Sequence, residues 1–298
     1  MEPIFFVSFF EEKQWGGQKL SSLYGKYPAG INIGESWEFS SVLYRQTFVR
    51  DGIYAGTMLS DLYKREQAHL FGTETPYVPF VIKLIDARKR IPVLVHGGGL
   101  KNDDTQVEGA YIIKIENEHR MVAGTSLKNG LELFGAIAEN TLENHLNYLE
   151  IQEGDALLVP PGVFHCFGDD MLIYTITTPL IETASVFDWG RYSELKIDKV
   201  ADSFHYDDTL RTSKPEVIDE FRKVLLQNSC FKLLYIDARS PLPERTDAVF
   251  CAYTSLSPGR IDYNGKSKNF RAGETFLIPA HFDEYTISGG SLLKAIPA

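Results

Sequence analysis

The segment GDALLVPPGVFHCFG, residues 154–168, contains the pattern that decides the fold. It begins with a glycine and an acid typical of a tight turn, continues as an apolar run typical of a buried strand, and ends that run at a proline. A second copy, GETFLIPAHFDE, begins at Gly273 and has its glycine, acid and proline at the same offsets. Two copies of one strand unit predict two related β-barrels. The second copy has Glu284 at the offset of His165, so we expect only the first barrel to hold a metal.

The length and patterning of the chain agree with a mostly β protein of two parts. Its 298 residues exceed the usual size of one compact domain. Short apolar runs separated by Gly, Pro, Asn and Asp predict strands, beginning with residues 4–10. We expect a metal-binding domain over residues 1–200, with N-terminal strands and short helices. Residues 201–298 are expected to form a helix and a smaller β domain without metal.

Three segments have the apolar spacing of helices. Residues 57–72 have leucines near helical spacing and end at a glycine, and residues 127–150 contain one or two short helices. Residues 213–228 have Ser213 as a candidate cap, Pro215 in the first turn and an apolar stripe along one side. A polar connection precedes this last segment, which places the domain boundary near residue 200.

Composition excludes several functional classes. The formal net charge of −10 argues against broad binding to nucleic acids or anionic membranes, although a local basic pocket could still bind an anionic substrate. The cysteines, Cys166, Cys230 and Cys251, form no CxxC pair and predict no disulfide framework, which favours a reducing cytoplasm. Residues 1–15 lack the basic start of a signal peptide, and no apolar run reaches the roughly 18 residues of a membrane span.

Three candidate metal ligands, His96, Glu108 and His165, lie in apolar, strand-like segments. Two imidazoles and one carboxylate bind zinc or a similar divalent ion and leave a coordination position open for a substrate. A lone histidine in an apolar strand is more often a hydrogen-bonded core residue. Three candidate ligands in three β segments favour the metal site. The other histidines lie in charged, amphipathic or polar surroundings, which favours structural or exposed positions for them.

At these residues the chain resembles the type I mannose-6-phosphate isomerases of the short form, which are cupin-fold metalloenzymes. The matching segments span roughly the first two-thirds of the chain; they are WGG (15–17), IGESWEFSS (33–41), PFVIKLIDA (79–87), VLVHGGG (93–99), VEGAYIIKI (107–115), GDALLVPPGVFHCFG (154–168) and VFDWGR (186–191). The resemblance implies jelly-roll barrels with a few helices at their sides. It also implies interconversion of mannose 6-phosphate and fructose 6-phosphate. We expect the protein to be a cytoplasmic monomer or homodimer. One Zn²⁺ or another divalent ion per chain would be held by His96, Glu108 and His165.

The chain departs from this family at the first ligand strand. Where the family has Ser-x-Gln-x-His-Pro, residues 92–97 read PVLVHG. The glutamine ligand is therefore Leu94 here, and a serine that contacts substrate is Pro92. Because leucine cannot bind a metal, we expect three protein ligands, which is a workable number for a catalytic site.

Two further departures concern charged groups of the family. The lysine that usually precedes the glutamate is missing, and Gln106 and Val107 stand there. An Asp and an Arg upstream of VFDWGR correspond to Ile181 and Ser185. The resemblance implies that this arginine assists proton transfer, so the family's catalytic set is incomplete in this chain.

The remaining candidates are charged residues in matching segments. Isomerisation moves a proton between C1 and C2 through an enediolate, and either Glu108 or Lys114, which alternation places on one face, could carry it; Lys114 could equally lie in solvent. Lys83 interrupts an apolar run, so it must pair with an acid or face a polar pocket that binds substrate. Arg191 either contacts the substrate or pairs with Asp188.

The segment IGESWEFSS contributes candidates of lower specificity. Trp37 is expected to pack in the core, while Glu35 and Glu38 support the site or bind surface cations. Glycines 97–99 resemble a phosphate loop only superficially, because neither a helix nor a Lys-Ser/Thr pair follows them. They are expected to form a loop at the barrel mouth.

Three functions agree with these observations. The first is a metal-dependent isomerase of sugar phosphates. The second is a non-catalytic protein of the same fold that binds a sugar or sugar phosphate. The third is an isomerase of altered specificity, because Pro92, Leu94 and Ser185 reshape the pocket.

Overall fold

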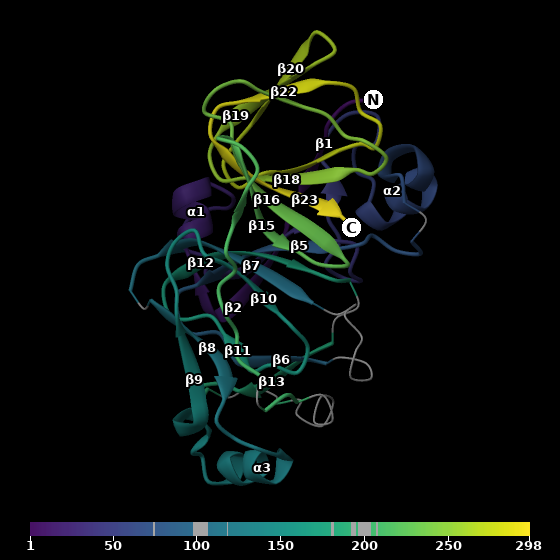
Figure 1. The fold of residues 1–298 in the computed structure, drawn as a ribbon. Helices are drawn as coiled ribbons and strands as arrows, with labels where there is room; N and C mark the ends of the chain where they lie inside the picture. The colour runs from purple at the N-terminus through teal and green to yellow at the C-terminus, as the bar shows by residue number, and fades with distance from the viewer. Residues whose placement is uncertain are drawn as a thin grey trace.

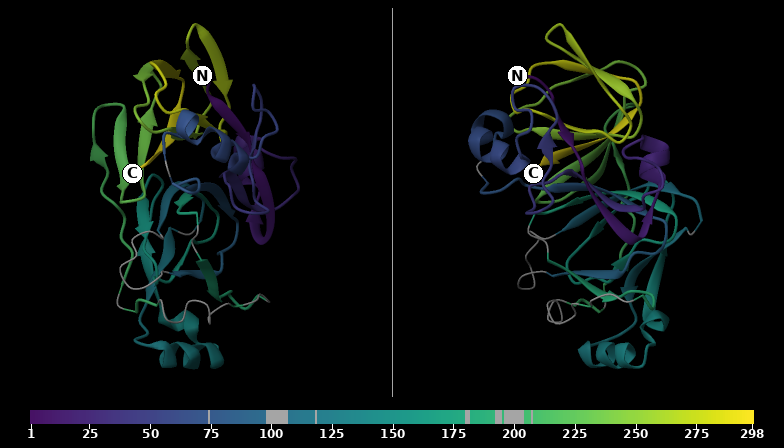
Figure 2. Two further views of the ribbon diagram at one scale, coloured as in Figure 1. Left: turned by 90° about the vertical axis from the view of Figure 1, so that its right-hand side faces the viewer. Right: turned by 180° about the vertical axis from the view of Figure 1, so that it is seen from behind.

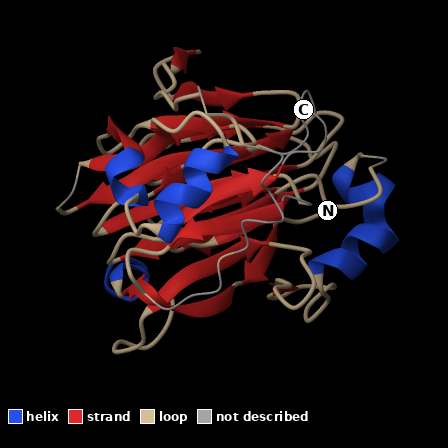
Figure 3. Cartoon of the chain, turned by 90° about the horizontal axis from the view of Figure 1, so that it is seen from below, coloured by secondary structure: helices blue, strands red, loops and turns tan. Residues whose placement is uncertain are grey.

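A computed structural model describes residues 1–73, 75–97, 107–117, 119–179, 182–191, 195, 204–206 and 208–298. Antiparallel sheets dominate it, and Figure 1 shows them stacked into two units, one above the other. The few helices lie outside the strands (Figure 3). The predicted fold class, a mostly β, cupin-like architecture with helices at the sides, is confirmed.

The lower unit in Figure 1 is a sandwich of a six-stranded and a five-stranded sheet, which we call the first sandwich. The six-stranded sheet contains β10 (Ala156–Val159), β7 (Glu108–Ile115), β12 (Met171–Thr177), β5 (Val81–Ala87), β2 (Phe9–Gly17) and β3 (Ile33–Phe39). The five-stranded sheet contains β13 (Glu182–Phe187), β6 (Val93–Gly97), β11 (His165–Cys166), β8 (Arg120–Thr125) and β9 (Leu146–Glu150). One apolar cluster joins side chains of both sheets.

The upper unit, the second sandwich, pairs an eight-stranded with a four-stranded sheet. The larger sheet contains β14 (Glu216–Val217), β15 (Arg222–Gln227), β16 (Phe231–Asp237), β23 (Ser291–Pro297), β18 (Cys251–Ser255), β21 (Thr275–Ile278), β1 (Ile4–Val7) and β4 (Phe48–Val49). The smaller contains β17 (Leu242–Glu244), β22 (Tyr285–Ser288), β19 (Gly259–Tyr263) and β20 (Lys266–Phe270).

Another apolar cluster lies between the two sandwiches and holds them together. It packs the outer face of the six-stranded sheet against the outer face of the eight-stranded sheet. Gly109, the residue after Glu108, lies at this junction, where an added Cβ would meet Leu226 at 2.9 Å and Ile176 at 3.0 Å. The glycine of the VEG motif therefore lets the strand that carries Glu108 approach the second sandwich closely.

Two of the three predicted helical segments contain helices. Residues 57–72 form α2 (Leu59–Glu66), which continues as a π-helical turn at Gln67–Phe71 and ends at Gly72 with φ 62°. Residues 127–150 form α3 (Gly130–Ala138) and a 3₁₀ turn at Leu142–His145, but their last residues are β9. A third helix, α1 (Lys19–Tyr24), was not predicted.

The helix predicted over residues 213–228 is wrong, because this segment forms β14 and β15. Val224 packs inside the second sandwich, whereas Leu225 and Leu226 pack in the layer between the sandwiches. The register of β15 also shifts between Val224 and Leu226. A strand buried on both faces has consecutive apolar residues, which mimic the stripe of a helix.

The expected division into residues 1–200 and 201–298 remains a prediction, since residues 196–203 lie outside the described residues. The strand pairings show that the two units are not formed by two consecutive stretches of the chain. β1 pairs with β21, with Ile4 opposite Leu277, so the first strand of the chain belongs to the sheet of the second sandwich. Figure 2 shows this N-terminal strand beside the late strands of the chain.

The two repeat segments have the predicted local structure. Gly154 and Gly273 both adopt positive φ, 91° and 79°, which an L side chain rarely adopts. Each precedes a strand, β10 in the first sandwich and β21 in the second. The glycine therefore supplies the turn at corresponding places in both sandwiches.

A buried carboxylate connects two of the matching motifs. Asp86, in KLIDA, accepts a hydrogen bond at Oδ2 from the backbone N–H of Leu20, 3.1 Å away, at the start of α1. Its Oδ1 lies 2.1 Å from where a Cβ on Gly17 of WGG would stand. Any larger residue at Gly17 would displace this carboxylate, so the two motifs occur together for a packing reason.

No helix in the described part of the chain is both long and apolar enough to cross a membrane.

Substitution of Asp86 by Asn should make stability less sensitive to pH. Burial raises the pKa of Asp86 from 3.8 to about 6, so the folded state holds a proton that the unfolded state has released between these pH values. The stabilisation is present below pH 3.8 and is lost as pH rises through about 6. Since one pKa unit corresponds to 1.36 kcal/mol, the unfolding free energy of Asp86→Asn relative to wild type should rise by about 2.4 kcal/mol between pH 4 and pH 7.5. Denaturant unfolding at both pH values measures this, and an unchanged difference would contradict it.

Candidate metal centre

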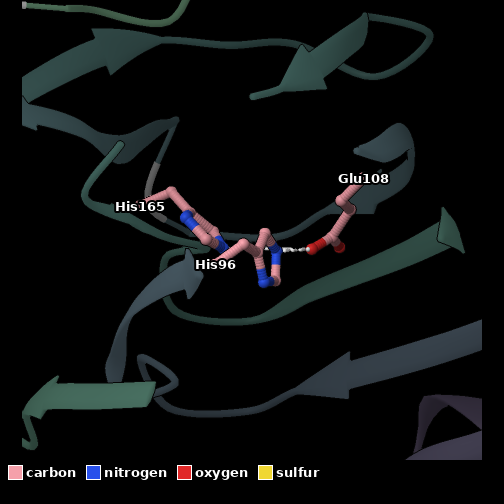
Figure 4. Close-up of side chains that lie close together, drawn as sticks. All are labelled: His96, Glu108 and His165. Carbon is pink, nitrogen blue, oxygen red and sulfur yellow. Dashed lines mark hydrogen bonds and ion pairs between the residues drawn. The ribbon is translucent and has the colours of Figure 1, made fainter. Parts of the chain in front are cut away.

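Three strands of the first sandwich bring His96, Glu108 and His165 together. His96 is on β6 and His165 on β11 in the five-stranded sheet, and Glu108 is the first residue of β7 in the six-stranded sheet. All three are buried, with His165 fully inaccessible. Figure 4 shows the two imidazoles side by side and the carboxylate turned toward His96.

The PPG turn before His165 is attached to the strand of His96. The backbone N–H of Gly162, at φ 79°, donates to the carbonyl oxygen of His96 over 2.8 Å. β11 then pairs with β6 so that His165 lies opposite Leu94, two residues before His96. Because residues two apart on a strand share a face, both imidazoles point to the same side of the sheet.

The candidate ligand atoms lie within 4.8 Å of one another. His96 Nε2 is 2.6 Å from Glu108 Oε2, and His165 Nε2 is 3.9 Å from the same oxygen. The two imidazole rings are 4.5 Å apart between centroids. Among the residues that the structure describes, this is the one group of three or more His, Cys, Asp or Glu with such spacing.

Bonds on the far side of each ring leave the Nε2 atoms facing the centre. His165 Nδ1 lies 3.0 Å from the carbonyl oxygen of Val163, so it must carry the proton and donate. His165 Nε2 is then a bare lone pair, and it is buried with no hydrogen-bond partner in the described structure. His96 Nδ1 lies 2.9 Å from Thr183 Oγ1, which orients the second ring. A divalent cation fits here, because it would satisfy the lone pair of His165 and neutralise the carboxylate.

Electrostatics keep the ligands in the protonation states that a metal needs. Burial would raise the pKa of Glu108, but a hydrogen bond from His96 and the nearby charges of His96, His165 and Lys83 lower it to about 2. Burial, together with the charge of His96, lowers the pKa of His165 from 6.5 to about 4. At neutral pH the carboxylate is thus ionised and His165 is neutral.

The three residues line a cavity of about 500 Å³. Its other walls carry Leu94 and Pro92 beside the histidines and Trp15, Trp37, Glu35 and Lys83 on the six-stranded sheet. Leu94 shares the cavity face with His96, as strand alternation predicted. An apolar side chain therefore stands at the position of the family's glutamine.

Lys83 is the sequence-predicted substrate residue that the structure places in this cavity. Its Nζ lies 3.4 Å from Glu35 Oε1 and 4.9 Å from the centroid of Trp37. Lys83 therefore meets both alternatives that the sequence left open, since it pairs with an acid and also faces the cavity. Trp37, expected in the core, is 9% exposed and forms part of the cavity wall.

Lys114 is not brought to the site, and the expectation that it shares the face of Glu108 is wrong. The register of β7 against β12 shifts between Leu172 and Ile173, which lie opposite Lys114 and Ile112. Ile115 consequently takes the core position, and Lys114 is half-exposed and pairs with Glu153 at 2.9 Å. Six residues of strand also separate it from Glu108 by about 20 Å.

Arg191 makes the contacts of a structural residue. Its Nε donates to Asp188 Oδ1 over 2.8 Å and its Nη2 to the carbonyl oxygen of Arg90 over 2.8 Å. It borders a separate small cavity beside α3. The bond to Asp188 was one of the two readings of the sequence, and substrate contact has no support in this geometry.

The other candidates separate into cavity and support positions. Glu35 lines the cavity, whereas Glu38 is 1% exposed and accepts bonds from Lys26 and Ser8. Ser185 Oγ is buried without a hydrogen-bond partner in the described structure. Gln106, Ile181 and two of the three glycines at 97–99 lie outside the described residues.

Sequence reasoning missed two cationic residues of the cavity, Lys13 and Arg45. Lys13 is on β2, two residues before the WGG motif, and Arg45 follows β3 in a segment without any motif. The signal for Lys13 was its position in a strand adjoining a matching motif. No sequence pattern indicated that Arg45 reaches the cavity.

Comparisons with known proteins agree with the motifs. No family model matches the chain. The mannose-6-phosphate isomerase of Streptococcus mutans is 27% identical over 303 residues, covering 97% of this chain and 96% of that protein. The Bacillus subtilis protein named "Probable mannose-6-phosphate isomerase GmuF" is 27% identical over 305 residues, covering 96% of both. The predicted resemblance to the mannose-6-phosphate isomerases is confirmed.

Solved structures show the same fold. The mannose 6-phosphate isomerase of Bacillus subtilis superposes with a TM-score of 0.89 at 24% identity, covering 99% of both chains. A variant of phosphomannose isomerase from Salmonella typhimurium gives 0.76 at 11% identity over the whole of both chains. The relationship thus covers both sandwiches, beyond the first two-thirds where the motifs lie.

Replacing either histidine should abolish metal binding. His96→Ala and His165→Ala each leave two of three ligand side chains, so after incubation with a divalent metal and gel filtration we expect the wild type to retain the metal and both variants to lose it. His69→Ala, an exposed histidine outside the site, is the matched control and should retain metal. Elemental analysis gives the ratio of metal to protein, and stoichiometric zinc in both site variants would refute the assignment.

Proposed function

We propose that this protein is a metal-dependent aldose–ketose isomerase that interconverts mannose 6-phosphate and fructose 6-phosphate. The observation that carries the proposal is the convergence of His96, Glu108 and His165 in the wall of a cavity that Lys83 also lines. Similarity to mannose-6-phosphate isomerases over nearly the whole chain supports the choice of substrate.

Zn²⁺ is the ion that we propose for the centre, one per chain. Two imidazoles and a carboxylate suit zinc, and three protein ligands leave a position for a substrate oxygen. When bound, the ion supplies polarisation of the sugar's carbonyl and hydroxyl oxygens. His96 and His165 would hold it through Nε2, and Glu108 through its carboxylate.

Proton transfer between C1 and C2 falls to residues inside the cavity. Glu108 is a weak base, because its pKa is lowered to about 2 and its carboxylate faces the metal position. Lys114 lies outside the cavity. Lys83 lies near the metal ligands, and with Glu35 it forms an ion pair 3.4 Å apart that combines a proton donor with a proton acceptor on the cavity wall. We therefore assign the shuttle to this pair.

The surrounding cavity fits a small phosphorylated sugar. Polar side chains such as Thr177, Thr178 and Thr183 line it together with the aromatic faces of Trp15 and Trp37. Hydroxyl groups and aromatic surfaces are the usual complement of a sugar. We propose a small-molecule substrate with no nucleic-acid or membrane partner and a cytoplasmic location.

A coupled isomerase assay tests the reaction. Zinc-loaded protein should convert mannose 6-phosphate to fructose 6-phosphate, and metal-free protein should not. A panel of other hexose and pentose phosphates run alongside identifies an isomerase of altered specificity. Absence of turnover on every sugar phosphate, with ligand binding still measurable, would instead establish the non-catalytic reading.

Replacement of Lys83 by Met should separate chemistry from metal binding. Methionine keeps the length of the side chain but removes the proton, so kcat should fall about 100-fold or more, as for loss of a general acid–base group. Zinc content should stay at the wild-type level. Lys266→Met, an exposed lysine of the second sandwich, is the matched control. A Lys83→Met enzyme with wild-type kcat would exclude Lys83 from the reaction.

A further inference from the structure

The cationic side chains of the cavity all come from one wall. Among the described residues that line it, the lysines and arginines are Lys13 on β2, Lys83 on β5 and Arg45 in the segment after β3. The opposite wall, formed by the five-stranded sheet, contributes Pro92, Leu94 and Thr183 besides the two histidine ligands. An anionic group that enters this cavity therefore finds its counter-charge on one side.

The cations alternate with two carboxylates in a continuous chain. Arg45 donates from Nε and Nη2 to the two oxygens of Glu11, over 2.9 and 3.0 Å. Lys13 Nζ lies 2.9 Å from Glu11 Oε1 and 3.6 Å from Glu35 Oε2, and Glu35 in turn meets Lys83 at 3.4 Å. Three positive and two negative charges leave an excess of one positive charge.

This charged chain has one end near the metal centre and the other at the cavity wall around Arg45. Lys83 is close enough to Glu108 and His165 for its charge to affect the pKa of both. Arg45 and Lys83 each lie over the indole of Trp37, with 5.1 and 4.9 Å to the ring centroid. Trp37 therefore orients both cations by cation–π contact.

Glu11 holds Arg45 in a fixed orientation. The bonds from Arg45 and Lys13 keep the pKa of Glu11 well below its ordinary range, so this carboxylate stays ionised. The Arg45 guanidinium donates to Glu11 through Nε and Nη2, which leaves the Nη1 hydrogens for another acceptor. The Arg45 side chain is 39% exposed, so a solute in the cavity can reach it.

We propose that Arg45, with Lys13 beside it, binds the phosphate group of the substrate and fixes which end of the sugar faces the metal. The inference rests on the proposed function for the identity of the sugar, but its chemistry, capture of a phosphoryl dianion, does not require turnover. Guanidinium and ammonium groups are the usual partners of phosphate in proteins. Lys83, between them and the metal ligands, faces the carbon atoms that react.

Steady-state kinetics of Arg45→Gln and Arg45→Lys test the assignment. Loss of a charged hydrogen bond should raise KM for mannose 6-phosphate roughly 10- to 100-fold in Arg45→Gln, with kcat changed little and zinc content unchanged. Arg45→Lys should recover part of the affinity, because lysine restores the positive charge but not the paired N–H donors of the guanidinium. Arg260→Gln, an exposed arginine of the second sandwich paired with Asp262, is the matched control.

Inorganic phosphate supplies a readout that does not depend on catalysis. Its dissociation constant, measured by calorimetry on the zinc-loaded protein, should rise in Arg45→Gln by a factor comparable to that of KM. Phosphate binding that depends on Arg45 in a protein without isomerase activity would support this site and reject the proposed reaction. An active enzyme whose KM and phosphate affinity are the same in Arg45→Gln would overturn this site alone. Failure of the wild type to bind phosphate would also overturn it.

Discussion

The constraint on which the site depends is a carboxylate buried beside two neighbouring imidazoles inside an apolar sandwich. Glu108 is 4% exposed, and a buried carboxylate without a partner would be strongly destabilising. In the structure His96 supplies that partner at 2.6 Å, while the lone pair of His165 Nε2 has none. The arrangement is incomplete as a hydrogen-bond network but complete as a set of metal ligands, and this asymmetry is the strongest physical argument for a cation.

The rest of the fold serves to hold these groups in place. The PPG turn attaches the strand of His165 to the carbonyl oxygen of His96, and Gly109 lets the strand of Glu108 pack against the second sandwich. The second sandwich thereby buries the outer face of the sheet that carries Glu108, Lys83 and Glu35. The cavity face of that sheet carries polar and charged side chains. Its ion pairs form a chain that begins at Lys83, near the metal position, and ends at Arg45.

The sequence predicted features that depend on local pattern. Strand alternation correctly placed Leu94 and His96 on one face, and the repeated glycine turns correctly indicated two β units. Prediction was wrong in two situations. In one, a bulge interrupts the alternation of a strand; in the other, a strand has the same apolar spacing as a helix. A β-bulge moved Lys114 off the face of Glu108, and burial on both faces made β15 resemble a helix. The approach of Arg45 to the cavity could not be predicted, because it depends on an ion pair with Glu11 from another strand.

The departures at Pro92 and Leu94 lie in one wall of the cavity, and its cations lie in the other. Anomalous diffraction at the zinc edge from crystals of the zinc-loaded protein tests the central claim most directly. We expect one strong peak bonded by Nε2 of His96, Nε2 of His165 and the Glu108 carboxylate, at about 2.0–2.2 Å from each, with an open position beside Leu94. An empty centre, or zinc held only by other residues, would contradict it.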